Sequence, residues 1–366
     1  MTRHRLEALL PPGAVPRPLA YGRLPTPLQY RPDLGADLGV RVLVKREDLL
    51  DDLASGHKAR KLAHAVARAR RRGADTLVTG GSLPSGQCVA VAAFARRYGL
   101  RSHLVYSGDQ QVRPHRPNGA YLLALLLADE VTWHERTPWQ RNAELLRAAC
   151  AEEARRGGRP FAVPPGVTVW PGLLGSVELG LELADQLGTG ADVVPGPIHL
   201  VAPAGSGGTC LGLAVAARLL GLPWRVHGIC VGGSRTSVTA EVAALRRQAV
   251  RRLGRQNLTD TPVEVHADWL GAGYDRPTAA ELRVLAEAVR RYRLPLDPTY
   301  MLRAFLGLLG LVRAGTIPRG ALVVLVHTGG NLGLFAGCPA LNDWLGETFA
   351  AHLAEPRPPA AVPNDH

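Results

Sequence analysis

Lysine is confined to one short segment of this chain. The 366 residues contain only three lysines, Lys45, Lys58 and Lys61, whereas arginine supplies the other 40 basic side chains. Arginine stays charged in water, but a buried lysine can lose its proton and form a Schiff base with an aldehyde. Lys58 closely follows a glycine at the predicted start of a helix. We therefore expect the chemistry of this protein to centre on Lys58.

A glycine-rich loop lies between a predicted strand at residues 198–202 and a helical segment. Backbone N–H groups at the start of a helix, together with two hydroxyls, form a cradle for an anion such as phosphate. The loop matches neither the P-loop nor the GxGxxG pattern, and taken alone it is equally compatible with a plain strand-to-helix turn. Its residues are Gly205, Ser206, Gly207, Gly208 and Thr209.

Two further polar loops also follow predicted strands. Residues 79–87 contain Ser85, and residues 326–331 contain Thr328. Taken alone, Ser85 is better explained as a helix cap. The Thr328 hydroxyl either bonds a ring nitrogen or only forms a hydrogen bond within its own loop. Together with Lys58 and the glycine-rich loop they predict pyridoxal phosphate as the cofactor. This planar aldehyde needs an amine, a phosphate cradle and polar groups around its ring.

Short β-branched runs alternate with helical patterns along most of the chain and would position these loops. Such alternation predicts an α/β fold of βαβ units, with open, mostly parallel twisted sheets and helices on both faces. Ligands in such folds bind beyond the carboxyl ends of the strands, where the polar loops fall. The predicted strands are residues 40–44, 76–79, 102–105, 161–163, 198–202, 225–231 and 321–326. The predicted helices are residues 64–72, 87–98, 118–128, 139–156, 174–187, 210–219, 238–253, 278–292 and 300–313.

Composition and charge argue against several other classes of protein. The hydrophobic content of 46% and the charged content of 20% are those of an ordinary globular chain. The net charge is +12, but the arginines are spread along helical segments, so we expect no nucleic-acid partner. The longest apolar stretch, residues 120–128, is too short to span a bilayer, which predicts no membrane association. The apolar run near the N-terminus is short and broken by prolines, so no signal peptide is expected.

The five cysteines are scattered, with no CxxC pair and no histidine at ligand spacing. This pattern predicts reduced, buried thiols in a cytoplasmic protein, and no metal site. The five are Cys88, Cys150, Cys210, Cys230 and Cys338.

Seven short motifs occur in the order and with the spacing of a known family. They are Pro25-Thr26-Pro27-Leu28, Lys45-Arg46-Glu47-Asp48, Gly56-His57-Lys58-Ala59-Arg60-Lys61-Leu62, Gly205 to Thr209, Gly271-Ala272-Gly273-Tyr274, Leu296-Asp297-Pro298-Thr299-Tyr300 and His327-Thr328-Gly329-Gly330. On these motifs the chain resembles the D-cysteine desulfhydrase and 1-aminocyclopropane-1-carboxylate deaminase family, which has the tryptophan-synthase-β fold (fold type II of pyridoxal-phosphate enzymes). The resemblance implies a large cofactor-binding domain at residues 1–62 and 175–366, a small substrate-side domain at residues 63–174, and a homodimer.

The same resemblance assigns roles to individual residues. Lys58 would be the Schiff-base lysine, and the glycine-rich loop would hold the cofactor phosphate. Thr328 would bond the pyridine nitrogen through a neutral hydroxyl, which leaves that nitrogen largely unprotonated. Ser85 would be an acid/base group or a contact for the substrate carboxylate, and the hydroxyls of Tyr274 and Tyr300 would lie near the substrate.

The chain departs from the family pattern at several positions. Gly86 removes an amide expected to bond the phenolic oxygen of the cofactor, and His57 replaces an asparagine beside the lysine. Met301 stands where the cyclopropane deaminases carry the glutamate that partners the ring nitrogen, which argues against that activity. Val167 and Val169 stand in a loop that is polar in the family pattern, and they make it largely apolar. If Val167, Val169 and Met301 face the substrate, they predict a larger or more apolar compound.

The predicted activity is that of a pyridoxal-phosphate-dependent lyase or deaminase acting on a small amino acid or amino-acid-like compound. Lys58, Ser85 or a tyrosine would remove a proton, and the resulting α-carbanion would expel a β-substituent or open a ring. Hydrolysis would then give an oxo acid and ammonia. The alternatives are a β-replacement synthase, a racemase or cyclase of a specialised biosynthetic pathway, and a non-catalytic protein that only binds the cofactor.

Overall fold

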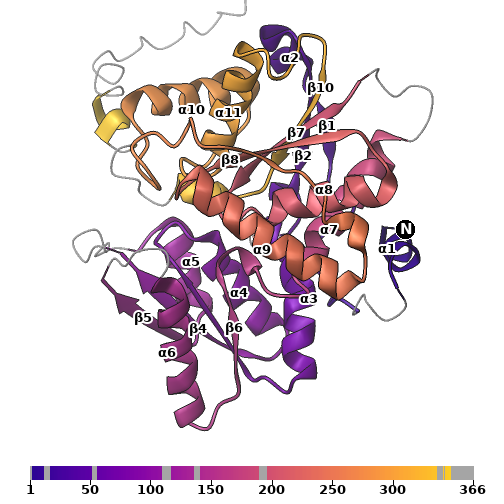
Figure 1. Cartoon of the computed structure of the whole chain (residues 1–366). Coiled ribbons are helices and arrows are strands. Elements are labelled where there is room, and N and C mark those ends of the chain that lie inside the picture. The colour runs from indigo at the N-terminus through magenta and orange to yellow at the C-terminus, as the bar shows by residue number, and fades with distance from the viewer. Residues whose placement is uncertain are drawn as a thin grey trace, which may run out of the picture.

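Two β-sheets and their flanking helices form two lobes of the molecule. The computed structural model describes residues 2–11, 17–51, 56–108, 117–135, 141–188, 196–335, 341 and 343–347. In Figure 1 the six-stranded sheet lies in the upper lobe and the four-stranded sheet in the lower lobe. This architecture confirms the predicted α/β class.

The larger sheet has six strands in the order β1-β2-β10-β7-β8-β9. Strand β1 is antiparallel to β2, and every other neighbouring pair in this sheet is parallel. The strands are Leu28–Tyr30 (β1), Arg41–Arg46 (β2), Ile198–Ala204 (β7), Trp224–Cys230 (β8), Glu264–His266 (β9) and Leu322–His327 (β10).

The smaller sheet has four strands in the order β5-β4-β3-β6, and all of its neighbouring pairs are parallel. The strands are Thr76–Gly81 (β3), Arg101–Ser107 (β4), Glu130–His134 (β5) and Pro160–Val163 (β6). The carboxyl ends of parallel strands meet at one edge of a sheet, so the loops that follow β3 and β6 lie close together.

Helices join most of these strands, as expected for βαβ units. The helices are Thr2–Leu9 (α1), Pro32–Leu38 (α2), Lys58–Arg71 (α3), Gly86–Arg97 (α4), Gly119–Leu127 (α5), Asn142–Arg155 (α6), Leu173–Leu187 (α7), Gly208–Leu220 (α8), Arg235–Leu253 (α9), Ala279–Tyr292 (α10), Met301–Arg313 (α11) and Asn331–Leu334 (α12).

Alternate residues of β10 face two different helical layers. Val324 and Val326 pack with residues of α7 and α8, whereas Val323 and Leu325 pack with residues of α10 and α11. Because both faces of this central parallel strand are buried, its sequence is continuously apolar instead of alternating. The predicted placement of helices on both faces is confirmed for this sheet.

All seven predicted strands and all nine predicted helices are present, with shifted ends. The largest shift is in α3, which begins at Lys58, where the preceding glycine predicted a helix start, and not at residue 64 as its periodicity predicted. The sequence missed β1, β5, β9, α1, α2 and α12. The domain division stays a prediction, and its two boundaries fall inside the continuous helices α3 and α7.

The described cysteines are all free thiols. Cys88, Cys210 and Cys230 are buried, and Cys150 is half-buried. Cys338 lies outside the described residues. These thiols agree with the prediction of reduced cysteines, except that Cys150 is less buried than expected.

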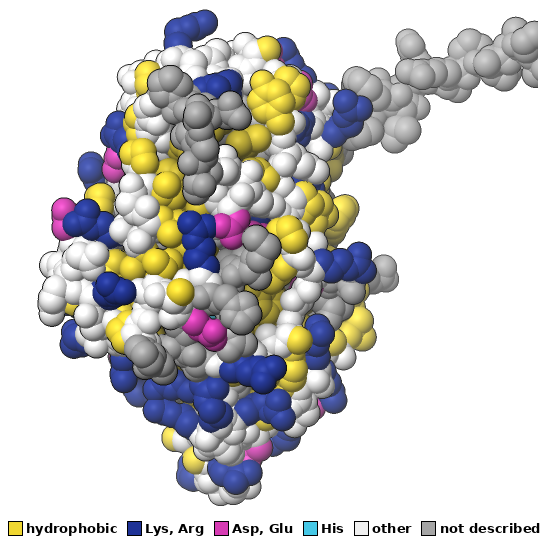
Figure 2. Space-filling model, turned by 90° about the vertical axis from the view of Figure 1, so that its right-hand side faces the viewer, with side chains coloured by type: hydrophobic (Ala, Val, Ile, Leu, Met, Phe, Trp, Pro, Cys, Tyr) yellow, Lys and Arg dark blue, Asp and Glu magenta, His cyan; other side chains and the backbone are white. Residues whose placement is uncertain are grey.

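The surface carries the arginines in a dispersed pattern. Figure 2 shows dark-blue Lys and Arg side chains over the whole visible face, densest toward the lower end, where the four-stranded sheet lies in Figure 1. Acidic and apolar side chains interrupt them on this face. Among the described helices, none has both the length and the apolar character needed to cross a bilayer.

Candidate active site

A cavity of about 410 Å³ lies where the carboxyl ends of strands from both sheets converge. The loops after β3, β7, β8 and β10 contribute to its lining, and its volume is in the range of small-molecule sites. The structure brings every residue to which the family resemblance assigned a role into this lining. They are Lys58, Ser85, Gly205, Ser206, Gly207, Gly208, Thr209, Tyr274, Tyr300 and Thr328.

Lys58 is the first residue of α3. The segment before it packs against the loop after β10, where the His57 backbone N–H donates to the Thr328 carbonyl oxygen at 3.1 Å. Gly56 has a φ of +56°, and a Cβ there would stand 2.2 Å from the same oxygen, so this contact requires glycine. The Lys58 Nζ lies 5.5 Å from the ring centroid of Tyr300. Burial lowers the pKa of Lys58, which favours the neutral, nucleophilic amine.

His57 also lines the cavity, beside Lys58. Its Nδ1 lies 2.8 Å from the Thr328 carbonyl oxygen. Because a carbonyl can only accept, Nδ1 must carry the proton, and the lone pair of the neutral ring is on Nε2. Burial, followed by the charge of Lys58, holds the pKa of His57 well below its usual value. The sequence registered His57 only as a departure from a family pattern, and the structure places its neutral ring in the lining of the cavity.

The glycine-rich loop connects β7 to the first turn of α8 and forms one end of the cavity. Gly207 has a φ of +70°, and a Cβ on it would stand 2.2 Å from the Val242 Cγ2 atom. Gly166, from the lobe of the smaller sheet, lies very close to this loop, since a Cβ on Gly166 would stand 2.1 Å from the Ser206 Oγ. Gly207 and Gly166 therefore cannot carry side chains, and an anion would meet the N–H groups of the first turn of α8 together with the Ser206 and Thr209 hydroxyls.

Lys61 lies at the same end of the cavity. Its Nζ donates to the Gly166 carbonyl at 3.2 Å and stands 3.4 Å from where a Cβ on Gly208 would be. Burial, and next the charge of Lys58, lower the pKa of Lys61 to about 7. The sequence assigned no role to Lys61, although its spacing of three residues from Lys58 places both lysines on one face of the helix.

Two tyrosines close another side of the cavity. The hydroxyls of Tyr274 and Tyr300 are 2.8 Å apart, and the Ser82 hydroxyl donates to Tyr274 at 3.3 Å. Burial raises the pKa of Tyr274 to about 12 and that of Tyr300 well above its usual value. Both phenols therefore stay protonated at neutral pH, where they act as hydrogen-bond donors and not as bases.

Asp297 holds Tyr300 in place at the start of α11. Its carboxylate accepts from the backbone N–H groups of Thr299 at 3.1 Å, Tyr300 at 2.7 Å and Met301 at 2.9 Å. These bonds satisfy N–H groups that a helix start leaves without intrahelical partners. The motif Asp297-Pro298-Thr299-Tyr300 thus places a tyrosine at the cavity through backbone contacts.

Ser85 occupies the N-cap position of α4, but its side chain makes no capping hydrogen bond. It packs against Gly81 and Cys88, since a Cβ on Gly81 would stand 2.4 Å from the Ser85 Oγ and 3.0 Å from the Cys88 Sγ. The Ser85 hydroxyl therefore does not cap the helix, and the interpretation of Ser85 as an ordinary helix cap is wrong. The hydroxyl is retained beside the cavity instead.

Three of the departures from the family pattern do not line the cavity. Met301 is completely buried beneath Thr328, whose hydroxyl donates to the Met301 Sδ at 3.6 Å. Val167 is buried in the core with a φ of +52°, and Val169 packs against the same cluster. The interpretation that these three side chains face the substrate is wrong, because Met301 lies under Thr328 at the start of α11 and the two valines pack into a hydrophobic cluster. Gly86 differs, since a Cβ on it would meet nothing within 4 Å.

Lys45, the third lysine, belongs to a buried ionic network behind the site. Its Nζ lies 2.5 Å from the Glu182 carboxylate. Arg60 of α3 pairs with Glu47 at 2.7 Å and with Glu182 at 2.8 Å. All four side chains are nearly inaccessible to solvent. The network ties α3, which carries Lys58, to β2 and α7.

Comparison with known proteins agrees with this geometry. Residues 19–329 match the family model described as "Pyridoxal-phosphate dependent enzyme". The chain is 31% identical over 319 residues to a D-cysteine desulfhydrase of Salmonella newport, a match that covers 86% of this chain and 94% of the relative. A Pyrococcus horikoshii protein with a provisional 1-aminocyclopropane-1-carboxylate deaminase name is 32% identical over 316 residues, covering 85% of this chain and 90% of the relative.

A solved structure is also similar over nearly the whole chain. The crystal structure of a homologue of 1-aminocyclopropane-1-carboxylate deaminase superposes with a TM-score of 0.79 at 30% identity. The match covers 93% of this chain and 99% of the other.

Proposed function

The chain belongs to the pyridoxal-phosphate-dependent enzyme family, and from this membership we propose that it is a lyase or deaminase of a small amino acid. The observation that carries the proposal is that Lys58 and the glycine-rich loop line one cavity. An amine for the aldehyde and an anion cradle for the phosphate are the two features this cofactor needs. The names of the relatives support a substrate with a leaving group or a strained ring next to an amino-bearing carbon.

The residues present fit the cofactor. Burial depresses the pKa of Lys58, as a nucleophilic amine requires. A side chain on Gly207 or Gly166 would fill the cradle or collide with its neighbours, so the loop is built for close backbone approach. Thr328 lines the cavity with a hydroxyl that can donate to a ring nitrogen, and Lys61 adds a cation beside the cradle.

When bound, pyridoxal phosphate supplies an electron sink for negative charge that develops on the carbon beside the substrate amine. Lys58 would hold the cofactor through its amine, and the same buried amine would take the proton from this carbon where the substrate carries one. Ser85 lines the same cavity and contacts the substrate carboxylate or moves a second proton. Tyr274 and Tyr300 remain protonated and donate hydrogen bonds to the substrate. Neither tyrosine serves as the base at neutral pH.

One observation favours a second candidate function, racemisation. His57 places a neutral ring with its lone pair on Nε2 next to Lys58. A racemase needs two groups that exchange protons with the same carbon, and His57 would be the second such group, since it lines the cavity together with Lys58. The two functions differ in their products, because elimination releases ammonia and racemisation only exchanges the α-proton with solvent.

The first test is the absorption spectrum of the protein with pyridoxal phosphate, before and after borohydride. We expect a visible band that borohydride bleaches in the wild type and that is missing from Lys58→Ala. Lys58→Arg is the matched control, since it keeps a positive charge but cannot form the covalent link. A bleachable band in both variants would contradict the assignment of Lys58.

The second test separates the candidate functions. D-cysteine, L-cysteine and 1-aminocyclopropane-1-carboxylate are supplied in turn in deuterated water. Ammonia and oxo acid are measured for all three, and α-deuteration for the two cysteines, because the cyclopropane compound has no α-hydrogen. Ammonia with oxo acid supports the lyase or deaminase. Deuteration without ammonia supports the racemase, and ammonia formed only with an added nucleophile would support β-replacement.

We also propose a two-domain, cytoplasmic homodimer. The family resemblance supports the dimer and the domain division at residues 62 and 174, and the free thiols support a reducing compartment. Light scattering of the purified protein tests the dimer, and fractionation of the source cells tests the compartment.

A further inference from the structure

Three histidines stack diagonally across the edge of the six-stranded sheet. His199 lies on β7, His227 on β8 and His266 on β9. The ring centroids of His199 and His227 are 5.2 Å apart, and those of His227 and His266 are 5.3 Å apart. Glu264 is the register partner of His227 on β9, so its side chain joins the same face. The proposed function uses none of these residues.

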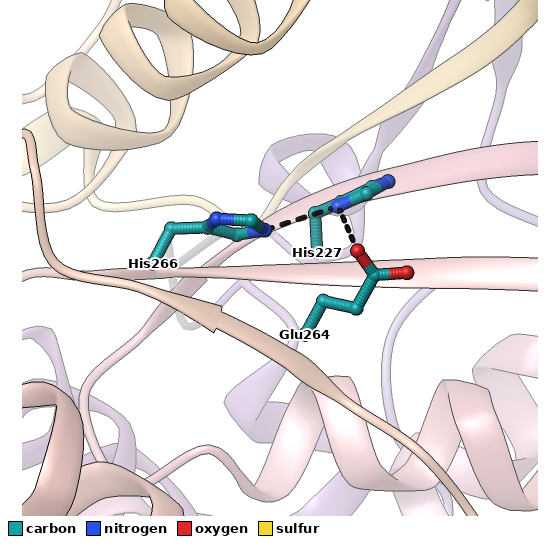
Figure 3. A group of neighbouring side chains, drawn as sticks. All are labelled: His227, Glu264 and His266. Carbon is teal, nitrogen blue, oxygen red and sulfur yellow. Dashed lines mark hydrogen bonds and ion pairs between the residues drawn. The ribbon is translucent and has the colours of Figure 1, made fainter. Parts of the chain in front are cut away.

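Three ligand atoms converge at the outer end of this stack, as Figure 3 shows for His227, Glu264 and His266. The His227 Nδ1 lies 3.1 Å from the His266 Nε2 and 3.5 Å from the Glu264 Oε2. All three atoms lie within 4.8 Å of one another. In a tetrahedral zinc site with bonds of about 2.0–2.1 Å, neighbouring ligand atoms are about 3.3 Å apart. The cluster therefore has close to the spacing that such an ion requires.

Neighbouring side chains hold two of these ligands in orientation. The His199 Nδ1 lies 3.0 Å from the His227 Nε2, which leaves Nδ1 of the buried His227 ring facing the cluster. Arg225 donates to both oxygens of Glu264, at 2.8 and 3.0 Å. Metal-binding histidines and carboxylates commonly have such outer hydrogen-bond partners.

We propose that His227, Glu264 and His266 bind a divalent transition-metal ion of the Zn²⁺ class, with water in the fourth position. Two imidazole nitrogens and one carboxylate oxygen form a ligand set typical of zinc. Glu264 and His266 are only partly buried, so an ion can reach the cluster from solvent. The sequence predicted no metal site because the ligands come from positions 227, 264 and 266, which only the pairing of β8 with β9 brings together.

A second cluster, His103, Glu130 and Glu153, is a weaker candidate. It contains a single histidine, so it offers one imidazole nitrogen where the first cluster offers two. The His103 nitrogens bond Glu153 at 3.0 Å and the Thr132 hydroxyl at 3.1 Å. The Glu130 carboxylate also accepts from Arg156 at 2.8 Å. This cluster is explained as a self-contained hydrogen-bond network.

The site has a structural connection to the cavity. Strand β8 leads into Val231, Gly232 and Gly233, and β9 leads into the segment that ends at Tyr274, and all four residues line the cavity. Gly232 packs on the Tyr274 ring, since a Cβ there would lie 3.1 Å from it. An ion that fixes β9 to β8 would therefore also restrain the position of Tyr274.

The test is metal binding by the holoenzyme after removal of metal with EDTA. The protein is dialysed against Zn²⁺, and bound zinc per chain is measured, with Co²⁺ as a second probe whose visible spectrum reports coordination. We expect one ion per chain and a higher unfolding midpoint with metal. His266→Ala and Glu264→Gln should each weaken binding by about 100-fold or more. The exposed His134, at the end of β5, provides the matched control His134→Ala, which should bind as the wild type does.

The cofactor band of each variant checks that it is folded. Absence of stoichiometric zinc in the folded wild type would overturn the proposal. So would zinc binding of wild-type affinity in both His266→Ala and Glu264→Gln, because the ion would then lie elsewhere. Glu264→Gln keeps the size of the side chain and supplies the second variant should His266→Ala fail to fold.

Discussion

The hydroxyls of Tyr274 and Tyr300 share one hydrogen bond of 2.8 Å at the wall of the cavity. Only one of the two can donate to the other, so the second hydroxyl proton of the pair can be directed to the substrate. The pair comes from two separate segments, and Asp297 fixes one member through the start of α11. The site thus contains a protonated donor pair opposite the Lys58 amine.

Tyr274→Phe should lower kcat/KM by about 10- to 100-fold without changing its pH dependence below pH 9, because one hydrogen bond to a charged group is lost. The pKa of Tyr274 is raised to about 12, so the tyrosine does not titrate in this range. The measurement is a pH–rate profile of both proteins. Loss of an acidic limb near neutral pH in the variant, where activity otherwise falls as the pH is lowered, would instead identify Tyr274 as the base.

Lys61 should make cofactor binding dependent on pH. Its pKa in the empty site is about 7, and a bound phosphate dianion favours the protonated amine. Affinity of the apoprotein should therefore be full below pH 7 and should fall by about tenfold per unit above it, because one proton is then taken up on binding.

Titration of apoprotein with pyridoxal phosphate between pH 6 and 9 measures this effect. Lys61→Arg is the control, since arginine keeps the charge at every pH and should remove the dependence. An unchanged pH slope in Lys61→Arg would show that another group is responsible.

Gly86→Asn should strengthen retention of the cofactor. The new side chain enters open space at the start of α4, so the unfolding midpoint of the apoprotein should change little. The family resemblance implies that an amide here bonds the phenolic oxygen, which is expected to slow cofactor loss several-fold on dialysis. Gly86→Ala, which adds a side chain without an amide, should leave the rate of loss unchanged.

Arg60→Met should destabilise the protein by about 3–5 kcal/mol, because it leaves the buried Glu47 without its ion-pair partner and Glu182 with Lys45 alone. Urea unfolding of the apoprotein measures the change. The exposed ion pair of Arg159 with Asp75 gives the comparison, and Arg159→Met should cost about 1 kcal/mol or less. Equal losses in the two variants would mean that the buried network contributes no more than a surface pair.

Much of the fold was predictable because it depends on local pattern. The apolar runs at β7 and β10 and the helical periodicity of α10 are visible in the sequence. Strand β9 was missed because its three residues, Glu-Val-His, carry no apolar run, and only pairing with β8 makes them a strand.

The site was predictable to a similar extent. Residues such as Thr328 follow strands whose carboxyl ends must meet, so their convergence is a consequence of the topology. The direction of the Val167 side chain was not predictable, because it depends on a backbone φ of +52° that valine rarely adopts. The role of Lys61 depends on Gly166, which approaches it from the other lobe.

The position of Arg60 between the two cavity lysines has a consequence for how this enzyme can be altered. Arg60 faces the ionic network behind the site, while Lys58 and Lys61, on the same turn of α3, face the cavity. Rotating or sliding the helix to reposition either amine would separate Arg60 from Glu47 and Glu182. Redesign for a new substrate therefore has to leave α3 fixed and reshape the opposite wall, where Ser82 and Ser85 follow β3.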